Sequence, residues 1–111
     1  MNDVVKQQVD EIIKRIVEAA KPEKVILFGS YARGEAGPAS DLDLLVVESE
    51  PFGKRRSRVA EIGKLERAIG AIPISTDILV YSRDELERFR HAANHVIFRA
   101  LREGEVVYDG S

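Results

Sequence analysis

Apolar residues recur at steps of three and four positions in two parts of the chain, which is the repeat of an amphipathic helix. The first part is residues 3–20, and Pro22 ends it because proline cannot continue a helix. The second part is residues 54–69, and a further helical stretch is expected over residues 92–103. Gly104 follows the last of them and suits a left-handed helix cap. We therefore expect helices over these three ranges.

Short apolar runs separate the expected helices and have the length of buried strands. Residues 24–28 form the first run, which stops at Gly29, and residues 42–48 form the second. Residues 74–81 form the third, and residues 106–108 are expected to add a short edge strand. The second and third runs each contain an Asp, which is out of place in a buried strand. The order of elements predicts an α/β (α+β) domain with one core between its layers.

Turn and capping signals define the connections between these elements. Residues 31–33 suit the first turn of a short helix after Gly29 and Ser30, and residues 35–40 are rich in turn formers and are expected to be a loop. Ser82 and Glu85 have the spacing of a capping box, so a further helix is expected to begin there. The expected elements leave no linker, which indicates a single domain over residues 1–111.

Length and composition limit the classes of protein to which the chain can belong. With 111 residues it has room for one core, so an enzyme of this size relies on another molecule for part of its specificity. A net charge of −2 provides no bulk attraction to nucleic acid or anionic membrane. The absence of cysteine excludes disulfides, thiolate zinc sites and a Cys nucleophile. The chain lacks a membrane-length apolar run and signal-peptide features, so we expect a cytoplasmic protein.

Three aspartates carry the most informative chemistry. Asp41 and Asp43 are separated by one residue at the start of a strand, so their carboxylates face the same side. Two ionised carboxylates side by side near a core repel each other, and this costs free energy unless a cation lies between them. The pair therefore suggests one or two hard divalent metal ions. Asp77 lies in the next strand and completes a three-carboxylate site if the two strands pair in a matching register. Such a site can hold two Mg²⁺ ions about 3.5–4 Å apart, the arrangement used for in-line phosphoryl and nucleotidyl transfer.

Each aspartate also has a simpler structural interpretation. Asp41 could be a turn residue, and Asp77 could be an edge-strand acid that faces solvent. Asp43 is harder to explain in this way because apolar residues flank it on both sides. The combination of the three favours a metal site. An EF-hand is excluded because leucine and valine occupy positions that would have to supply ligands.

The turn after the first strand has the composition of a phosphate-binding turn. Gly29 permits close approach of the backbone, and the Ser30 hydroxyl adds a donor to the free N–H groups of a helix start. A plain strand-to-helix turn is the alternative for both residues. Arg33 could clamp a phosphate or neutralise a neighbouring acid. The segment is not an ATPase P-loop, because Glu35 and Ala36 stand where Lys and Ser or Thr are required.

Two further groups of residues have structural interpretations that are simpler than their functional ones. The basic run is typical of a solvated helix face, with contact to a triphosphate, RNA or an acidic partner as the alternative; it comprises Lys54, Arg55, Arg56 and Arg58. His91 and His95 are four residues apart on an expected helix, a spacing that can ligate a metal. No further ligand is near them in the sequence, which favours surface or capping histidines.

Taken together, residues 29–34 (Gly-Ser-Tyr-Ala-Arg-Gly), residues 40–44 (Ser-Asp-Leu-Asp-Leu) and Asp77 resemble the nucleotidyltransferase superfamily of the DNA polymerase beta type. The small size of the chain and the twelve-residue step from Gly29 to Asp41 are similar to those of the minimal nucleotidyltransferases, or MNT antitoxins. The resemblance spans nearly the whole chain. It implies the nucleotidyltransferase fold, a small mixed β-sheet with helices packed on it.

The resemblance also implies a role for each matching residue. The nucleotide-binding residues that it implies are Gly29 and Ser30, for the β- and γ-phosphates of an NTP, and Arg33. Asp41 and Asp43 would ligate two Mg²⁺ ions, and Asp77 would hold the ion that activates the attacking hydroxyl. No side-chain base is then required, because the metal lowers the pKa of the hydroxyl.

The same resemblance implies a substrate and a partner. It implies transfer of AMP from ATP, or of another NMP from its NTP, to a hydroxyl, typically a Tyr of a HEPN-domain toxin. The chain would then be an antitoxin and part of a hetero-oligomer, in agreement with the apolar Val96 and Ile97 near its C-terminus. Two alternatives stay open: a non-catalytic antitoxin that neutralises its partner by binding, and a transferase acting on a small molecule or tRNA. No residue identifies the acceptor or the base of the NTP.

Overall fold

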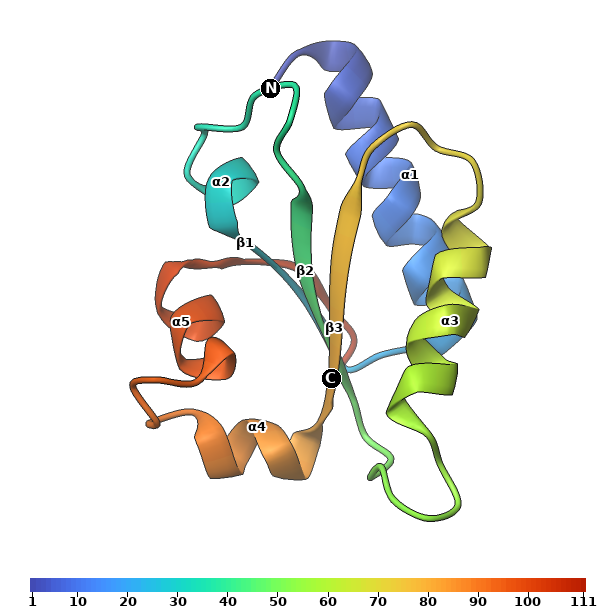
Figure 1. Cartoon of the computed structure of the whole chain (residues 1–111), viewed down its shortest axis with the longest axis vertical. Helices are drawn as coiled ribbons and strands as arrows, with labels where there is room; N and C mark the ends of the chain where they lie inside the picture. Colours follow the sequence, from blue (N-terminus) through green and yellow to red (C-terminus); the bar gives the residue numbers. More distant parts are fainter.

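The computed structural model describes residues 1–111, and Figure 1 shows how its elements are arranged. In chain order they are α1 (Asp3–Ala20), β1 (Lys24–Phe28), α2 (Gly29–Ala32), β2 (Leu42–Glu48), α3 (Arg58–Ile69), β3 (Thr76–Ser82), α4 (Arg83–Phe89), α5 (Val96–Glu103) and β4 (Glu105–Asp109). The helix expected over 3–20 and the strands expected over 24–28 and 42–48 match these bounds. β3 begins two residues later than the expected range 74–81, and β4 extends beyond 106–108 at both ends.

The four strands form one mixed sheet in the order β3-β2-β1-β4. β2 pairs with β3 in parallel, whereas β1 pairs with β2 and with β4 in antiparallel orientation. The parallel pair requires a long crossover connection, and α3 lies within that connection. The small mixed sheet with helices packed on it, which the motifs implied, is confirmed.

Helices cover both faces of the sheet, with α1 and α3 on one face and α4 and α5 on the other (Figure 1). Side chains of β2 alternate between these faces. Leu44 and Val46 pack with α1 and α3, whereas Leu45 and Val47 pack with α4 and α5. This double burial explains why the strand is apolar without alternation. No helix is long and apolar enough to span a membrane.

The helix expected over 54–69 is shorter than predicted at its N-terminal end. It begins at Arg58, because Ser57 has an extended backbone and caps the helix through its side-chain oxygen. Before the cap, Gly53 and Arg56 pair in an isolated antiparallel bridge. The first residues of the expected range therefore form a tight loop, and the prediction that they belong to the helix is wrong.

The helix expected over 92–103 also begins later than predicted. It starts at Val96, and the His95 side chain caps it by accepting a backbone hydrogen bond at 3.1 Å. The left-handed cap expected at Gly104 is wrong, because its φ of −88° is ordinary for any residue. A Cβ at this position would lie 2.3 Å from the carbonyl oxygen of Ala100. Gly104 is therefore required for close packing and not for its backbone freedom.

The capping box predicted at the start of α4 is confirmed and is part of a larger contact. Ser82 Oγ accepts a hydrogen bond from the Glu85 N–H at 3.3 Å, and Glu85 Oε1 accepts one from the Ser82 N–H at 3.0 Å. The Glu85 carboxylate also pairs with the guanidinium of Arg58, the first residue of α3. This pair connects α3 to α4. Arg58 also donates a hydrogen bond to the Val80 carbonyl oxygen of β3, which is the edge strand.

A buried ionic cluster lies where β2 ends. Glu48 is 5% exposed, and its Oε1 accepts a hydrogen bond from Arg56 while its Oε2 has no partner. Burial, together with the neighbouring Glu61 carboxylate, raises the pKa of Glu48 to about 7. A proton on Glu48 allows it to donate a hydrogen bond to Glu61, which two carboxylates cannot form. The cluster is therefore most stable when Glu48 is protonated.

We expect this cluster to make the free energy of unfolding fall as the pH rises through about 7. The folded-state pKa of Glu48 lies above the ordinary value of 4.5, so its contribution is fully present below about pH 4.5 and is lost above its folded pKa. Glu48→Gln keeps the shape and the donor without the titration. At about pH 8.5 it should be more stable than the wild type by roughly 1–3 kcal/mol, and at about pH 4.5 the two should be similar.

Thermal denaturation followed by circular dichroism at these two pH values measures the effect. Glu50→Gln is the matched control, because Glu50 contacts the same Arg56 but has a side chain that is 72% exposed. It should leave the pH dependence of unfolding unchanged. An equal pH dependence in the wild type and in Glu48→Gln would show that Glu48 is not the titrating group.

Candidate active site

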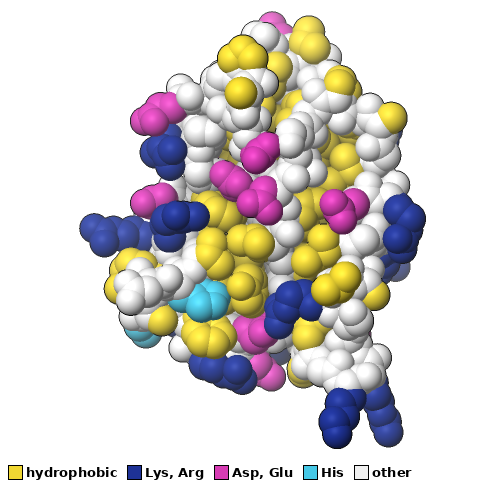
Figure 2. Space-filling view, viewed as in Figure 1, with side chains coloured by type: hydrophobic (Ala, Val, Ile, Leu, Met, Phe, Trp, Pro, Cys, Tyr) yellow, Lys and Arg dark blue, Asp and Glu magenta, His cyan; other side chains and the backbone are white.

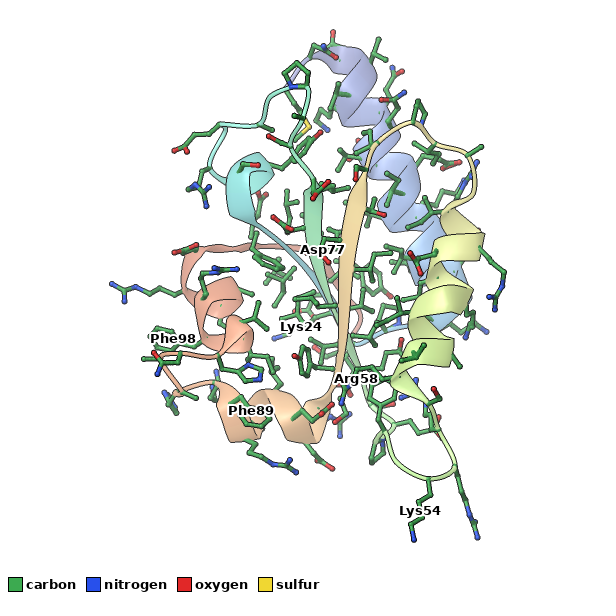
Figure 3. The ribbon with its side chains drawn as sticks, viewed as in Figure 1. Lys24, Lys54, Arg58, Asp77, Phe89 and Phe98 are labelled. Carbon is green, nitrogen blue, oxygen red and sulfur yellow. The ribbon has the colours of Figure 1, made fainter.

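The three predicted acids lie at the beginnings of two neighbouring strands. In the parallel ladder of β2 and β3, Asp43 is directly opposite Asp77. Both face the α4/α5 side of the sheet, because Leu45 and Leu79, two positions further along each strand, pack on that side. Asp41 lies just before β2. Figure 3 shows Asp77 on β3, and Figure 2 shows acidic side chains gathered where β2 and β3 begin.

The electrostatics of the site centre on Asp43. Burial raises the pKa of the Asp43 carboxyl above its ordinary value, and the charges of Asp77 and Asp41 raise it further. The positive charges of Arg99 and Arg33 act in the opposite direction. The ionised form of Asp43 is therefore held at a cost in the folded protein. A cation bound among the three acids would offset both the repulsion and the burial.

Gly29 is the residue on which the close packing of this site depends. It follows β1 directly, and the last residue of that strand, Phe28, is opposite Asp43 in the β1–β2 ladder. Gly29 has a φ of +73°, and a Cβ on it would lie 2.1 Å from Asp43 Oδ2. Only glycine fits both the backbone conformation and the space. The turn into α2, with Ser30 next in the chain, therefore lies against the Asp43 carboxylate.

Arg33 lies at the end of α2 and is partly engaged by acids of its own chain. Its Nε is 3.3 Å from Glu35 Oε2, and its Nη1 is 3.9 Å from Glu103 Oε2 on α5. The side chain is half exposed, and its charge acts on Asp43. Both sequence interpretations of Arg33, a phosphate clamp and a neutralising cation, are compatible with this position.

Arg99 also lies near the site, although no sequence pattern predicts it there. It lies on α5 between Ile97 and Ala100, both of which are buried against the sheet. Its guanidinium carbon is 6.0 Å from the centre of the Phe28 ring, and among the cations it acts most strongly on Asp43. No motif marks this position in the sequence. Only the packing of α5 on β1 brings it to the acids.

The chemistry of the acids fits a divalent metal ion that is bound together with a substrate. No three or more acidic, His or Cys side chains converge closely enough to form a metal site of protein ligands alone. Mg²⁺ in phosphoryl-transfer sites usually takes one or two carboxylates, while waters and substrate phosphates supply the remaining ligands. The hard oxygen ligands of Asp41, Asp43 and Asp77 could supply that protein share.

The other candidate residues lie away from this site. Arg56 and Arg58 pair with Glu48 and Glu85, as described above, and are not free for a ligand. Lys54 is exposed and points away from the body of the molecule at the tip of the loop before α3 (Figure 3). His91 is exposed as well, and His95 is the cap of α5. The preference for capping and surface histidines over a metal pair agrees with these positions.

Solved structures with the same arrangement of elements include proposed nucleotidyltransferases. A proposed minimal nucleotidyltransferase superposes with a TM-score of 0.60 and 27% identity, over 93% of this chain and 92% of that one. A proposed nucleotidyltransferase from Sulfolobus solfataricus gives a TM-score of 0.59 and 22% identity, over 98% of this chain and 89% of that one. A complex of a tri-AMPylated HEPN toxin with an MNT antitoxin from Shewanella oneidensis gives 0.51 and 19%, over 94% and 71%. The last two likenesses concern the fold alone.

Sequence comparisons give the family. The family model for the nucleotidyltransferase domain matches residues 9–107. A proposed protein adenylyltransferase of Methanocaldococcus jannaschii is 35% identical over 75 residues, which are 62% of this chain and 76% of the relative. A second one from that organism is 43% identical over 49 residues, which are 39% of this chain and 49% of the relative. The chain is therefore a nucleotidyltransferase and belongs to the nucleotidyltransferase domain family.

Proposed function

We propose that this chain transfers AMP from ATP to a hydroxyl group of a partner protein in a Mg²⁺-dependent reaction. The observation that carries the proposal is the pairing of Asp43 with Asp77 beside the Gly29 turn. It brings two carboxylates next to a helix start with free N–H groups. The carboxylates could bind the metal ions of a metal-bound triphosphate, and the N–H groups could bind its phosphates. The 35% identity to a proposed protein adenylyltransferase supports AMP as the group that is transferred and a protein as the acceptor.

In this proposal the residues of the chain bind and align the reactants. Gly29 and Ser30 hold the β- and γ-phosphates, and Asp41 and Asp43 bind the nucleotide through its metal ions. Asp77 lies on the edge strand and would hold the metal ion that activates the acceptor hydroxyl. When bound, Mg²⁺ lowers the pKa of that hydroxyl and neutralises charge on the leaving group. The acceptor oxygen forms a bond to the α-phosphorus. The bond between the α-phosphorus and the oxygen that bridges to the β-phosphate breaks, and pyrophosphate leaves. The hydroxyl proton passes to solvent.

We further propose that the acceptor is a Tyr of a HEPN-domain toxin and that the chain is its antitoxin. The support is the likeness of its fold to the antitoxin in the complex with an AMPylated HEPN toxin. The open position of the acids agrees with a protein acceptor, because Asp41 and Asp77 are exposed at the surface. A hydroxyl on a protruding side chain of a partner could reach them without a deep pocket.

Intact-mass spectrometry of a HEPN-domain partner tests the proposal. The partner is incubated with this chain, ATP and Mg²⁺, and in parallel with the Asp41→Ala, Asp43→Ala double variant. We expect a gain of one or more AMP units that requires the wild-type chain, ATP and the metal. If the partner is neutralised without a gain in mass, and the double variant neutralises it equally well, then the chain acts by direct binding and not by catalysis. If AMP is found on tRNA or on an aminoglycoside but not on protein, then the proposed protein acceptor is wrong and the chain is a tRNA or small-molecule transferase.

A further inference from the structure

We propose that Arg99 is a further substrate-binding residue, which holds the phosphate tail of the nucleotide and then the pyrophosphate that leaves. The inference rests on the proposed function and adds a direction to it. The acceptor would approach from the β3 side of the site and pyrophosphate would depart on the α5 side.

The first support is a row of residues that crosses three strands. Phe28 of β1 is opposite Asp43 of β2, and Asp43 is opposite Asp77 of β3. Arg99 lies over the Phe28 ring. The row therefore runs from a cation through the half-buried Asp43 to the acid on the edge strand. Two strand spacings separate its ends, which is about 10 Å.

The second support is that Arg99 has no partner in its own chain. It forms no ion pair and no side-chain hydrogen bond, whereas Arg33 is shared between Glu35 and Glu103. The side chain is exposed. The two buried residues that flank it fix the helix against the sheet, so the position of Arg99 near the site does not depend on a mobile loop. It is the cation near the acids that is free to bind an anion.

The third support is the distribution of charge around the site. Figure 2 shows basic side chains at the edge of the molecule beside α2 and α5, with acidic side chains among them. A triphosphate bound at the Gly29 turn would have its negative tail directed toward these cations. A guanidinium matches a phosphate with two parallel hydrogen bonds, which a point charge cannot form.

The direction of the reaction follows from this row. Transfer of a nucleotidyl group is an in-line displacement, so the attacking oxygen and the leaving oxygen lie on opposite sides of the α-phosphorus. With Arg99 on the leaving side, the attacking hydroxyl lies on the side of Asp77. β3 is the edge of the sheet, so that side is open to a partner.

Steady-state kinetics of the Arg99→Ala and Arg99→Lys variants test the proposal, with Arg102→Ala as the matched control. Arg102 lies on the same helix and is exposed, but its charge is not among those that act on Asp43. We expect Arg99→Ala to raise the KM for ATP and the inhibition constant of pyrophosphate by about ten- to a hundredfold, the usual loss for a hydrogen-bonded charge. Arg99→Lys should recover part of this loss, and Arg102→Ala should stay within about twofold of the wild type.

Binding of Mg²⁺-pyrophosphate, followed by calorimetry, gives a second readout that needs no turnover. It should weaken in Arg99→Ala by the same factor, while AMP binding stays unchanged because AMP lacks the tail. Wild-type transfer with unchanged ATP and pyrophosphate constants in Arg99→Ala would overturn the inference and leave the proposed function intact. If Arg99→Ala loses pyrophosphate binding but the wild type transfers no AMP, then the role of Arg99 stands and the proposed function is wrong.

Discussion

Replacing Asp43 by Asn should abolish nucleotidyl transfer and at the same time raise the melting temperature. The pKa of the Asp43 carboxyl is raised by burial and by the charges of Asp77 and Asp41, so the ionised form destabilises the fold near neutral pH. Asn has the same shape without the charge and mimics the protonated acid. It also loses the charge that would hold a metal ion, which should cost about 4 kcal/mol of transition-state stabilisation, or about 10³-fold in rate.

The pH dependence distinguishes this explanation from a general effect of the substitution. The folded pKa lies above the unfolded one, so the stability advantage of Asp43→Asn should be present near neutral pH and vanish below about pH 4, where Asp43 of the wild type is protonated. Asp10→Asn is the control, because Asp10 is exposed and pairs with Lys6 away from the site. Transfer by that variant should be normal. An Asp43→Asn variant that melts lower, or keeps its activity, would contradict the account.

Replacing Gly29 by Ala should have the second-largest effect, and it should reduce both stability and transfer. The new Cβ would have to share the space of Asp43 Oδ2, and the φ of +73° is strained for any residue with a side chain. The backbone strain alone costs about 1–2 kcal/mol. The displaced carboxylate adds to that cost and disturbs the site, so we expect at least a tenfold loss of transfer, about 1.4 kcal/mol.

Gly34→Ala separates the two causes. Gly34 has the same φ of +73°, but a Cβ there meets no atom within 4 Å. It should therefore show only the backbone cost and retain transfer. Chemical denaturation of both variants measures the difference, and combining Gly29→Ala with Asp43→Ala should recover the part of the stability that the clash removes. Equal destabilisation by both glycine substitutions would mean that the contact with Asp43 does not matter.

Local patterns predicted much of the fold because local forces decide those parts. The repeat of α1, the capping box at Ser82 and the apolar run of β2 each depend on neighbours along the chain. The start of α3 could not be predicted in this way. Its apolar repeat begins only at Val59, so the repeat does not define where the helix starts within residues 54–58. The pairing of Gly53 with Arg56 and the hydrogen bond from Arg56 to Glu48 hold those first residues in a loop. Glu48 belongs to β2, so its contact with Arg56 leaves no pattern within the loop sequence.

The candidate site shows the same division. Spacing alone indicated that Asp41 and Asp43 share a side, but the alignment of Asp43 with Asp77 depends on the register of two strands that are more than twenty residues apart. A shift of one residue would have turned Asp77 to the opposite face. Arg99 was beyond prediction, because its place beside Phe28 results from the packing of α5 on the sheet.

The most direct test of the central claim requires this chain alone, since it does not depend on knowing the acceptor. Electron paramagnetic resonance of Mn²⁺, titrated with a non-hydrolysable ATP analogue into the wild type, Asp43→Asn and Asp77→Asn, reports whether the acids hold a metal-bound nucleotide. We expect Mn²⁺ to bind tightly to the wild type only when the nucleotide is present. In both variants it should bind weakly even with the nucleotide. Binding that is equally tight in all three chains would place the nucleotide elsewhere and contradict it.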